Sequence, residues 1–133
     1  MREEVLKRYF EARASVEELE SDLAGSREKV SEIEYRLHIV DMDSDFEVKR
    51  DHLLKLCDAV LHGELEAESL RIIGDALMMS DHFTWDGDRE EVISEVTFCW
   101  SAPEINYPLT NESVAMFRRW LLGEESLPKR GRE

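Results

Sequence analysis

Apolar residues recur every three or four positions along most of the chain, which is the period of an amphipathic α-helix. The first such stripe predicts a helix over residues 2–24, and Gly25 lies where a terminating glycine is expected. Later stripes predict four more helices, of which the first ends at Gly63, the second before Ser80 and the last at Gly123. Their apolar positions are Leu53, Leu54, Leu56, Cys57 and Val60, then Ala67, Leu70, Ile73, Leu77 and Met78, then Ile93, Val96 and Trp100, and finally Val114, Phe117, Trp120 and Leu121.

Residues 27–40 fit two patterns. Every third or fourth residue gives a helical stripe, whereas the alternate residues from Ile33 to Ile39 are also apolar, as in a strand. The sequence EKVSE at 28–32 is rich in helix formers, so we favour a helix.

Polar residues separate the stripes and predict how the helices begin. The aspartates of DMDSD, residues 41–45, supply caps for the helix that follows. Asp86 and Gly87 predict a turn, and Asp88 with Glu91 three residues later resembles a capping box. These two segments are therefore expected to be loops that lead into helices.

Residues 101–110 (SAPEINYPLT) break the helical pattern, because Pro103 and Pro108 exclude a helix through them. They predict an extended connector, and Thr110 or Asn111 caps the last helix. Three apolar side chains are expected to pack this connector onto the core: Ile105, Tyr107 and Leu109.

Five or six helices with short connectors predict an all-α fold, an antiparallel helical bundle. The chain has 133 residues, of which 42% are apolar, and this suffices for one packed core. We expect a single helical domain over residues 1–127 and a frayed basic tail at 128–133. The amino-terminal stripe would also suit a coiled coil for self-association, but packing within the bundle explains it equally well.

The chain is strongly acidic, with 31 acidic residues against 17 basic ones and a net charge of −14. This charge disfavours nucleic acid and anionic membranes as partners and favours a basic protein. The start, MREEVLKRYF, lacks the apolar core of a signal peptide, and no stretch is apolar enough to span a membrane, so we expect a cytoplasmic protein. Cys57 and Cys99 are then expected to be reduced core thiols rather than a disulfide.

The sequence carries no catalytic motif, so we expect a binding protein without a cofactor and not an enzyme. Aspartates alternate at 41, 43 and 45 as in a calcium loop, but Phe46 and His52 stand where that loop needs glycine and glutamate. A solvated capping turn explains the aspartates better. A metal-dependent enzyme built on His82, Asp81 and Asp86 is the alternative, but it would need these side chains to assemble in space.

The acidic charge is unevenly spread and is dense in the stretch that precedes the last helix. Residues 81–104 hold seven acids and one base, whereas residues 105–133 hold four acids and five bases. Aromatic residues stand among these acids, and such rings can anchor a basic partner that carboxylates attract. The predicted partner-binding residues are Asp81, Phe83, Trp85, Asp86, Asp88, Glu90, Glu91 and Glu95. A solvated helix face, with one or both of Phe83 and Trp85 closing the end of the bundle, is the competing interpretation.

The tract ALMMSDHFTWDGDREE, residues 76–91, resembles the helix followed by an aromatic and acidic turn in the colicin D type immunity family. Such bacterial proteins block the nuclease domains of colicins and of contact-dependent inhibition toxins. The resemblance implies a helical inhibitor whose carboxylates replace RNA or DNA phosphates in the basic cleft of a nuclease. The alternative with the same acidic surface is an interaction module of another pathway, such as an adaptor or a DNA-mimic regulator.

Overall fold

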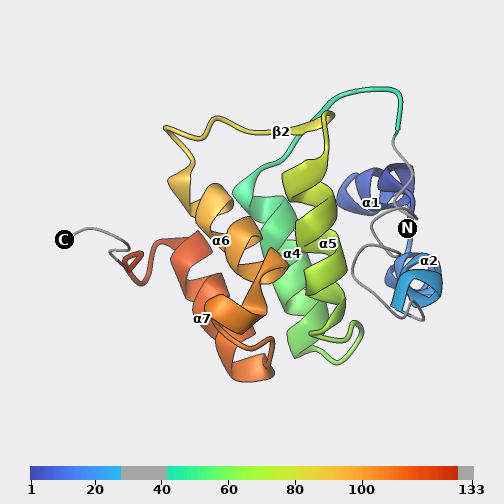
Figure 1. Cartoon of the computed structure of the whole chain (residues 1–133). Coiled ribbons are helices and arrows are strands. Elements are labelled where there is room, and N and C mark those ends of the chain that lie inside the picture. The colour runs from blue at the N-terminus through green and yellow to red at the C-terminus, as the bar shows by residue number, and fades with distance from the viewer. Residues whose placement is uncertain (28–41, 129–133) are drawn as a thin grey trace.

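The computed structural model describes residues 1–27 and 42–128, and this part of the chain is mostly helical (Figure 1). It contains six α-helices, one turn of 3-10 helix and one two-stranded parallel sheet. In chain order the elements are α1 (Glu3–Phe10), α2 (Val16–Arg27), β1 (Phe46–Glu47), α4 (Arg50–Leu61), α5 (Ser69–Met79), β2 (Phe83–Thr84), α6 (Glu91–Ser101), η1 (Pro103–Ile105) and α7 (Asn111–Leu122). The predominantly helical class is confirmed, and the antiparallel bundle stays a prediction.

Two earlier expectations fall outside the described residues. The segment 27–40, which fits both helix and strand, lies outside the described residues from residue 28 onward. Most of the expected basic tail, residues 129–133, also lies outside them. Within 1–27 and 42–128, no helix combines the length and the apolar character that crossing a membrane requires.

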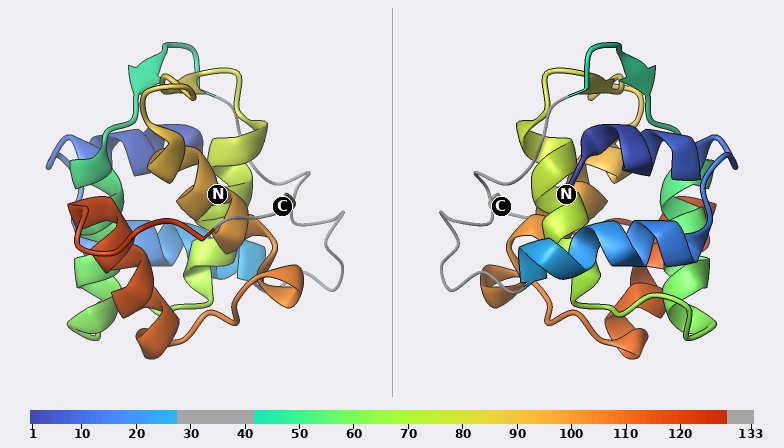
Figure 2. Two further views of the ribbon diagram at one scale, coloured as in Figure 1. Left: turned by 90° about the vertical axis from the view of Figure 1, so that its left-hand side faces the viewer. Right: turned by 90° about the vertical axis from the view of Figure 1, so that its right-hand side faces the viewer.

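Four helices, α4 to α7, make up one part of the structure, and α1 and α2 lie on the side of α4 and α5 opposite α6 and α7 (Figures 1 and 2). α5 packs extensively against α6, and α4 packs against α7. The stripes predicted for the last four helices face the core, where Trp100 and Phe117 are fully buried. Met78 is the exception, since 45% of its surface is exposed.

The single helix predicted over 2–24 is wrong, because α1 and α2 are separate helices. The chain turns at Ala12, whose φ of 63° lies in the left-handed region that disfavours a helix. Ser15 Oγ then accepts the N–H of Glu18 at 3.1 Å and begins α2, which continues past Gly25. Both helices bury their own apolar residues, so the periodic pattern continues across the turn and hides it.

The connector after α6 agrees only in part with the prediction. As expected, no α-helix passes through it; η1 contributes a single turn. Tyr107 packs edge-on against Phe117 and Trp120, and Leu109 is buried. The expected packing of Ile105 is wrong, since this side chain is 70% exposed.

The predicted helix ends are mostly confirmed. Thr110 caps α7, because its Oγ1 accepts the N–H of Ser113 at 3.2 Å. Gly63 and Gly123 follow α4 and α7 with φ values of 79° and 77°. The cap expected from 41–45 is wrong: α4 begins after Lys49, whose N–H donates to His52 Nδ1 at 2.9 Å.

Candidate functional site

The short sheet joins two acidic loops that are far apart in the sequence. β1 and β2 pair in parallel, with Phe46 opposite Phe83 and Glu47 opposite Thr84. Backbone hydrogen bonds of 2.8 Å run from Phe46 N–H to His82 O and from Val48 N–H to Thr84 O. Residues 43–51 and 81–91 therefore share one end of the molecule, which we call the acidic end.

The acidic end carries nine acidic residues and three Lys or Arg residues. The acids are Asp43, Asp45, Glu47, Asp51, Asp81, Asp86, Asp88, Glu90 and Glu91, of which all but the half-buried Glu90 are exposed. The bases are Lys49, Arg50 and Arg89. Lys7 of α1 also reaches this surface and donates to Ser44 Oγ at 3.0 Å. The end is therefore negative as a whole, with positive charges inside it.

The four acids of 43–51 are the part of this surface that sequence reasoning missed. Asp43 and Asp45 belong to the alternating aspartates of 41–45 that predict a capping turn, and Glu47 and Asp51 follow that turn. A strand of two residues leaves no periodic signal, so the pairing that brings Glu47 beside Thr84 could not be predicted from the pattern.

Asp45 and His82 form one of the side-chain pairs that join the two loops. His82 Nδ1 lies 2.8 Å from Asp45 Oδ1. The hydrogen bond to Asp45 raises the pKa of His82 above the ordinary histidine value, and the charges of Asp45, Glu3 and Asp81 raise the pKa further. The positive form of His82 is therefore favoured at the acidic end.

The Asp45–His82 pair makes a prediction about pH. The pKa of His82 is raised in the folded state, so the pair stabilises the fold at pH values below the ordinary histidine pKa, and this contribution is lost as the pH rises through the raised pKa. NMR titration of His82 should therefore show a raised pKa that falls toward the ordinary value in Asp45→Asn. Asp43→Asn is the matched control and should leave the pKa of His82 unchanged. An unaltered pKa in Asp45→Asn would contradict the pairing.

The two predicted aromatic anchors lie in different environments. Phe83 is 3% exposed, and its ring packs edge-on against Phe10 and Phe46. Trp85 is half-buried against the core, and its Nε1–H donates to Ser94 Oγ at 2.8 Å. Phe83 thus belongs to the core, whereas Trp85 is half-buried and lies against α6.

The predicted acids also divide by what their side chains do. Asp86 Oδ1 accepts the backbone N–H groups of Asp88 and Arg89, so it holds the loop before α6. Glu90 pairs with Arg50 of α4, with 2.7 Å between Oε1 and Nε. The capping box expected from Asp88 and Glu91 is wrong, because the residue before the helix is Glu90 and its side chain makes no cap hydrogen bond.

The remaining predicted acids lie on either side of this loop. Asp81, Asp88 and Glu91 are exposed, and they face solvent at the acidic end. Glu95 lies one turn into α6, is half-buried, and accepts the Cys99 thiol at 3.6 Å from Sγ to Oε2. The structure therefore brings most of the predicted acids together, with Glu95 at their edge.

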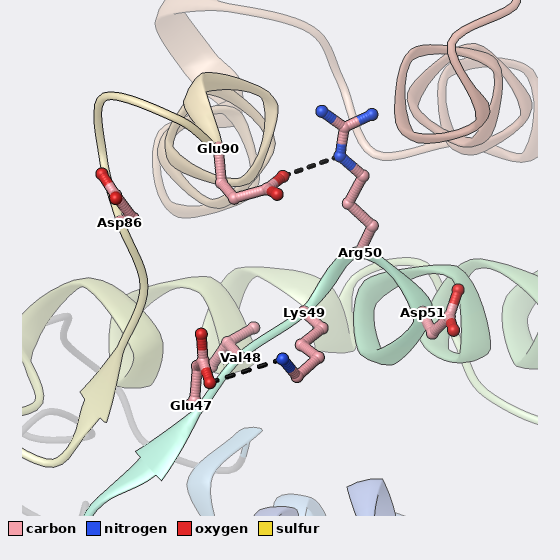
Figure 3. Close-up of a pocket in the computed structure, with 7 residues that line it drawn as sticks. All are labelled: Glu47, Val48, Lys49, Arg50, Asp51, Asp86 and Glu90. Atoms are coloured by element: carbon pink, nitrogen blue, oxygen red, sulfur yellow. Dashed lines mark hydrogen bonds and ion pairs between the residues drawn. The ribbon is translucent and has the colours of Figure 1, made fainter.

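A pocket of about 260 Å³ lies between the two loops (Figure 3). Its lining residues are Glu47, Val48, Lys49, Arg50, Asp51, Asp86 and Glu90. Figure 3 shows Glu90 and Arg50 directed toward each other, and Lys49 lies 3.4 Å from Glu47. The pocket is thus lined by charges of both signs, and a cationic side chain that enters it would compete with Lys49 and Arg50 for their carboxylates.

The described residues do not place a metal-binding group at this end. Across 1–27 and 42–128, no three His, Cys, Asp or Glu side chains converge as metal ligands, and this includes His82, Asp81 and Asp86. Comparisons of the chain with models of known protein families, with curated proteins and with solved structures found no match. Function is therefore inferred from the acidic end itself.

Proposed function

We propose that this chain is an immunity-type inhibitor that binds a basic protein, a bacterial nuclease toxin domain, through the acidic end. The observation that carries the proposal is the pairing of β1 with β2, which joins two acidic loops into one surface. The resemblance of residues 76–91 to the colicin D type immunity family supports the same function. In this proposal the chain acts in the bacterial cytoplasm, and an antiparallel helical bundle supports the loops.

The chemistry of such an inhibitor follows from its charges. A nuclease cleft binds phosphates with Lys and Arg side chains, and carboxylates held at a rigid surface can occupy the same positions. One exposed ion pair contributes only about 0.5 kcal/mol, so a tight complex needs many of them together. The long-range field of nine acids also speeds association, and this effect weakens with salt.

The aromatic contribution is smaller than the sequence predicted. Phe83 lies in the core, so we assign it no anchoring role. Trp85 is only half-buried, so it can contact a partner while it keeps its hydrogen bond to Ser94.

The test uses four exposed carboxylates that form no hydrogen bond or ion pair within residues 1–27 and 42–128: Asp43→Asn, Asp81→Asn, Asp88→Asn and Glu91→Gln. Asp86 and Glu90 are left intact, because they hold the loop and pair with Arg50. Four exposed pairs at about 0.5 kcal/mol each correspond to an affinity loss of roughly thirtyfold. The matched control removes the same charge from other exposed positions: Glu17→Gln, Glu66→Gln, Glu112→Gln and Glu124→Gln.

The measurement begins with capture on the immobilised chain from a lysate of the source organism, followed by mass spectrometry. The partner is then purified, and its affinity for the three proteins is measured at low and high salt. We expect to capture a basic nuclease that one equivalent of the chain inhibits. The four substitutions at the acidic end should weaken its binding, and the four control substitutions should not. Equal weakening by both variants would mean that only the net charge matters, and it would contradict the assignment of partner binding to the acidic end. A captured DNA-binding regulator without nuclease activity would favour the DNA-mimic alternative instead.

A further inference from the structure

Two consecutive methionines at the end of α5 are strongly exposed. Met78 is 45% exposed and Met79 54%, although Ala76 and Leu77 in the same turn are buried. The other large apolar side chains with comparable exposure in the described residues are Ile105 and Leu122, which lie on other elements. Exposed apolar side chains that adjoin one another mark a binding surface more often than isolated ones do.

Trp85 and Met78 contact neighbouring residues of α6. Thr97 Oγ1 lies 3.4 Å from Met78 Sδ, and Ser94 Oγ accepts the Nε1–H of Trp85 at 2.8 Å. Ser94 and Thr97 are three residues apart on α6, so they are neighbours on one face of that helix. Met78 and Trp85 therefore approach the same stretch of α6 from α5 and from the loop. We call Met78, Met79 and Trp85 the methionine patch.

The methionine patch borders the acidic end. Asp81 follows Met79 by two residues, Asp86 follows Trp85 directly, and Glu91 lies one turn before Ser94 on α6. These three carboxylates are exposed. An apolar centre with a negative rim is complementary to a ligand that has an apolar stripe with positive charges beside it. Methionine side chains are flexible and polarisable, so they adapt to apolar groups of different shapes.

We propose that the methionine patch and its acidic rim bind an amphipathic basic helix of a partner protein. Apolar side chains at helical spacing contact Met78 and Met79, and the Lys or Arg residues beside them contact the carboxylates of the rim. The inference rests on the proposed function, since it takes the partner to be basic. It adds the partner's shape and a second, apolar contribution to affinity. The same negative rim disfavours an anionic membrane and a second copy of this chain.

The probes are two synthetic peptides of identical leucine and lysine content. In one, leucine recurs at the spacing of a helical stripe, and in the other the same residues are scrambled so that no stripe forms. The full chain is tested as wild type, as Met78→Gln with Met79→Gln, and as Met78→Leu with Met79→Leu. Ile105→Gln is the matched control, because it changes an exposed apolar residue on η1. Affinities are measured by fluorescence anisotropy of the labelled peptides at two salt concentrations.

We expect the wild type to bind the striped peptide about tenfold more tightly than the scrambled one, a difference of about 1.4 kcal/mol. The double Gln variant should lose this preference, whereas the double Leu variant and Ile105→Gln should keep it. Circular dichroism should show the same helical content in all four proteins, because the changed side chains are exposed.

Four outcomes would overturn the inference. Equal and salt-sensitive binding of both peptides to the wild type would show that the methionine patch does not bind a helical stripe, but it would be consistent with the proposed function. Binding to neutral lipid vesicles that the double Gln variant loses would assign the patch to a membrane. Dimerisation in sedimentation experiments that the same variant loses would assign it to a second copy. If neither peptide binds in a salt-sensitive way, the proposed function itself is contradicted.

Discussion

Phe83→Ala is expected to lower the free energy of unfolding by about 3–5 kcal/mol, as is typical when a buried phenylalanine is truncated. Only 3% of Phe83 is exposed, and its ring centroid lies 6.2 Å from that of Phe10 and 6.1 Å from that of Phe46. These three rings join α1, β1 and β2, so the cavity would open where the two acidic loops are joined. Molecules that remain folded should keep their affinity for a basic partner, because Phe83 lies in the core and does not contact the partner.

Urea unfolding followed by circular dichroism measures the stability, and titration with the partner well below the unfolding midpoint measures the affinity. Thr84→Ala is the matched control, since Thr84 is the exposed neighbour in β2 and its backbone hydrogen bond is retained. It should change the stability by no more than about 0.5 kcal/mol. A Phe83→Ala protein with normal stability and weakened binding would show that Phe83 contacts the partner.

The helices could be predicted from the sequence wherever a buried stripe ends at a clear signal. Gly63 and Gly123 follow α4 and α7 as expected, and Thr110 caps α7. The prediction failed at Ala12, because the left-handed turn there carries no glycine, asparagine or proline to mark it. A stripe shared by two packed helices then looks like one helix. Local signals therefore predicted the ends of helices, but not a break that tertiary packing stabilises.

The candidate site was predictable in its second loop and not in its first. The acids and aromatics of 81–91 are concentrated in the sequence, so their common location needs no knowledge of the fold. The loop at 43–51 joins them only through β1 and β2, which are two residues long each. The sequence also could not separate Phe83 from Trp85, because both are large rings in one polar run. Their environments differ because Phe83 packs edge-on within an aromatic cluster that includes residues of α1 and β1.

Gly74→Ala is expected to lower the free energy of unfolding by about 3 kcal/mol, at the upper end of the cost of overpacking. Inside an exposed helix the same change would stabilise the protein by up to about 1 kcal/mol, because alanine is the better helix former. Here α5 and α6 approach closely. A Cβ atom on Gly74 would lie 2.8 Å from Trp100 Cβ and 2.9 Å from Ser101 N. Neither atom can move without shifting the α6 backbone, so the clash outweighs the gain in propensity.

Gly87→Ala is the matched control for this sign reversal, because the nearest atom to an added Cβ is Ser94 Oγ at 3.9 Å. Its free energy of unfolding should stay within about 0.5 kcal/mol of the wild type in the same urea experiment. A stabilised Gly74→Ala protein would contradict the close packing of α5 and α6.

That packing also places Met78 of α5 beside Thr97 of α6, so a shift between the two helices would change the methionine patch. Gly74→Ala should therefore weaken binding of the striped peptide more than binding of the scrambled one, although Gly74 itself is buried and contacts neither peptide.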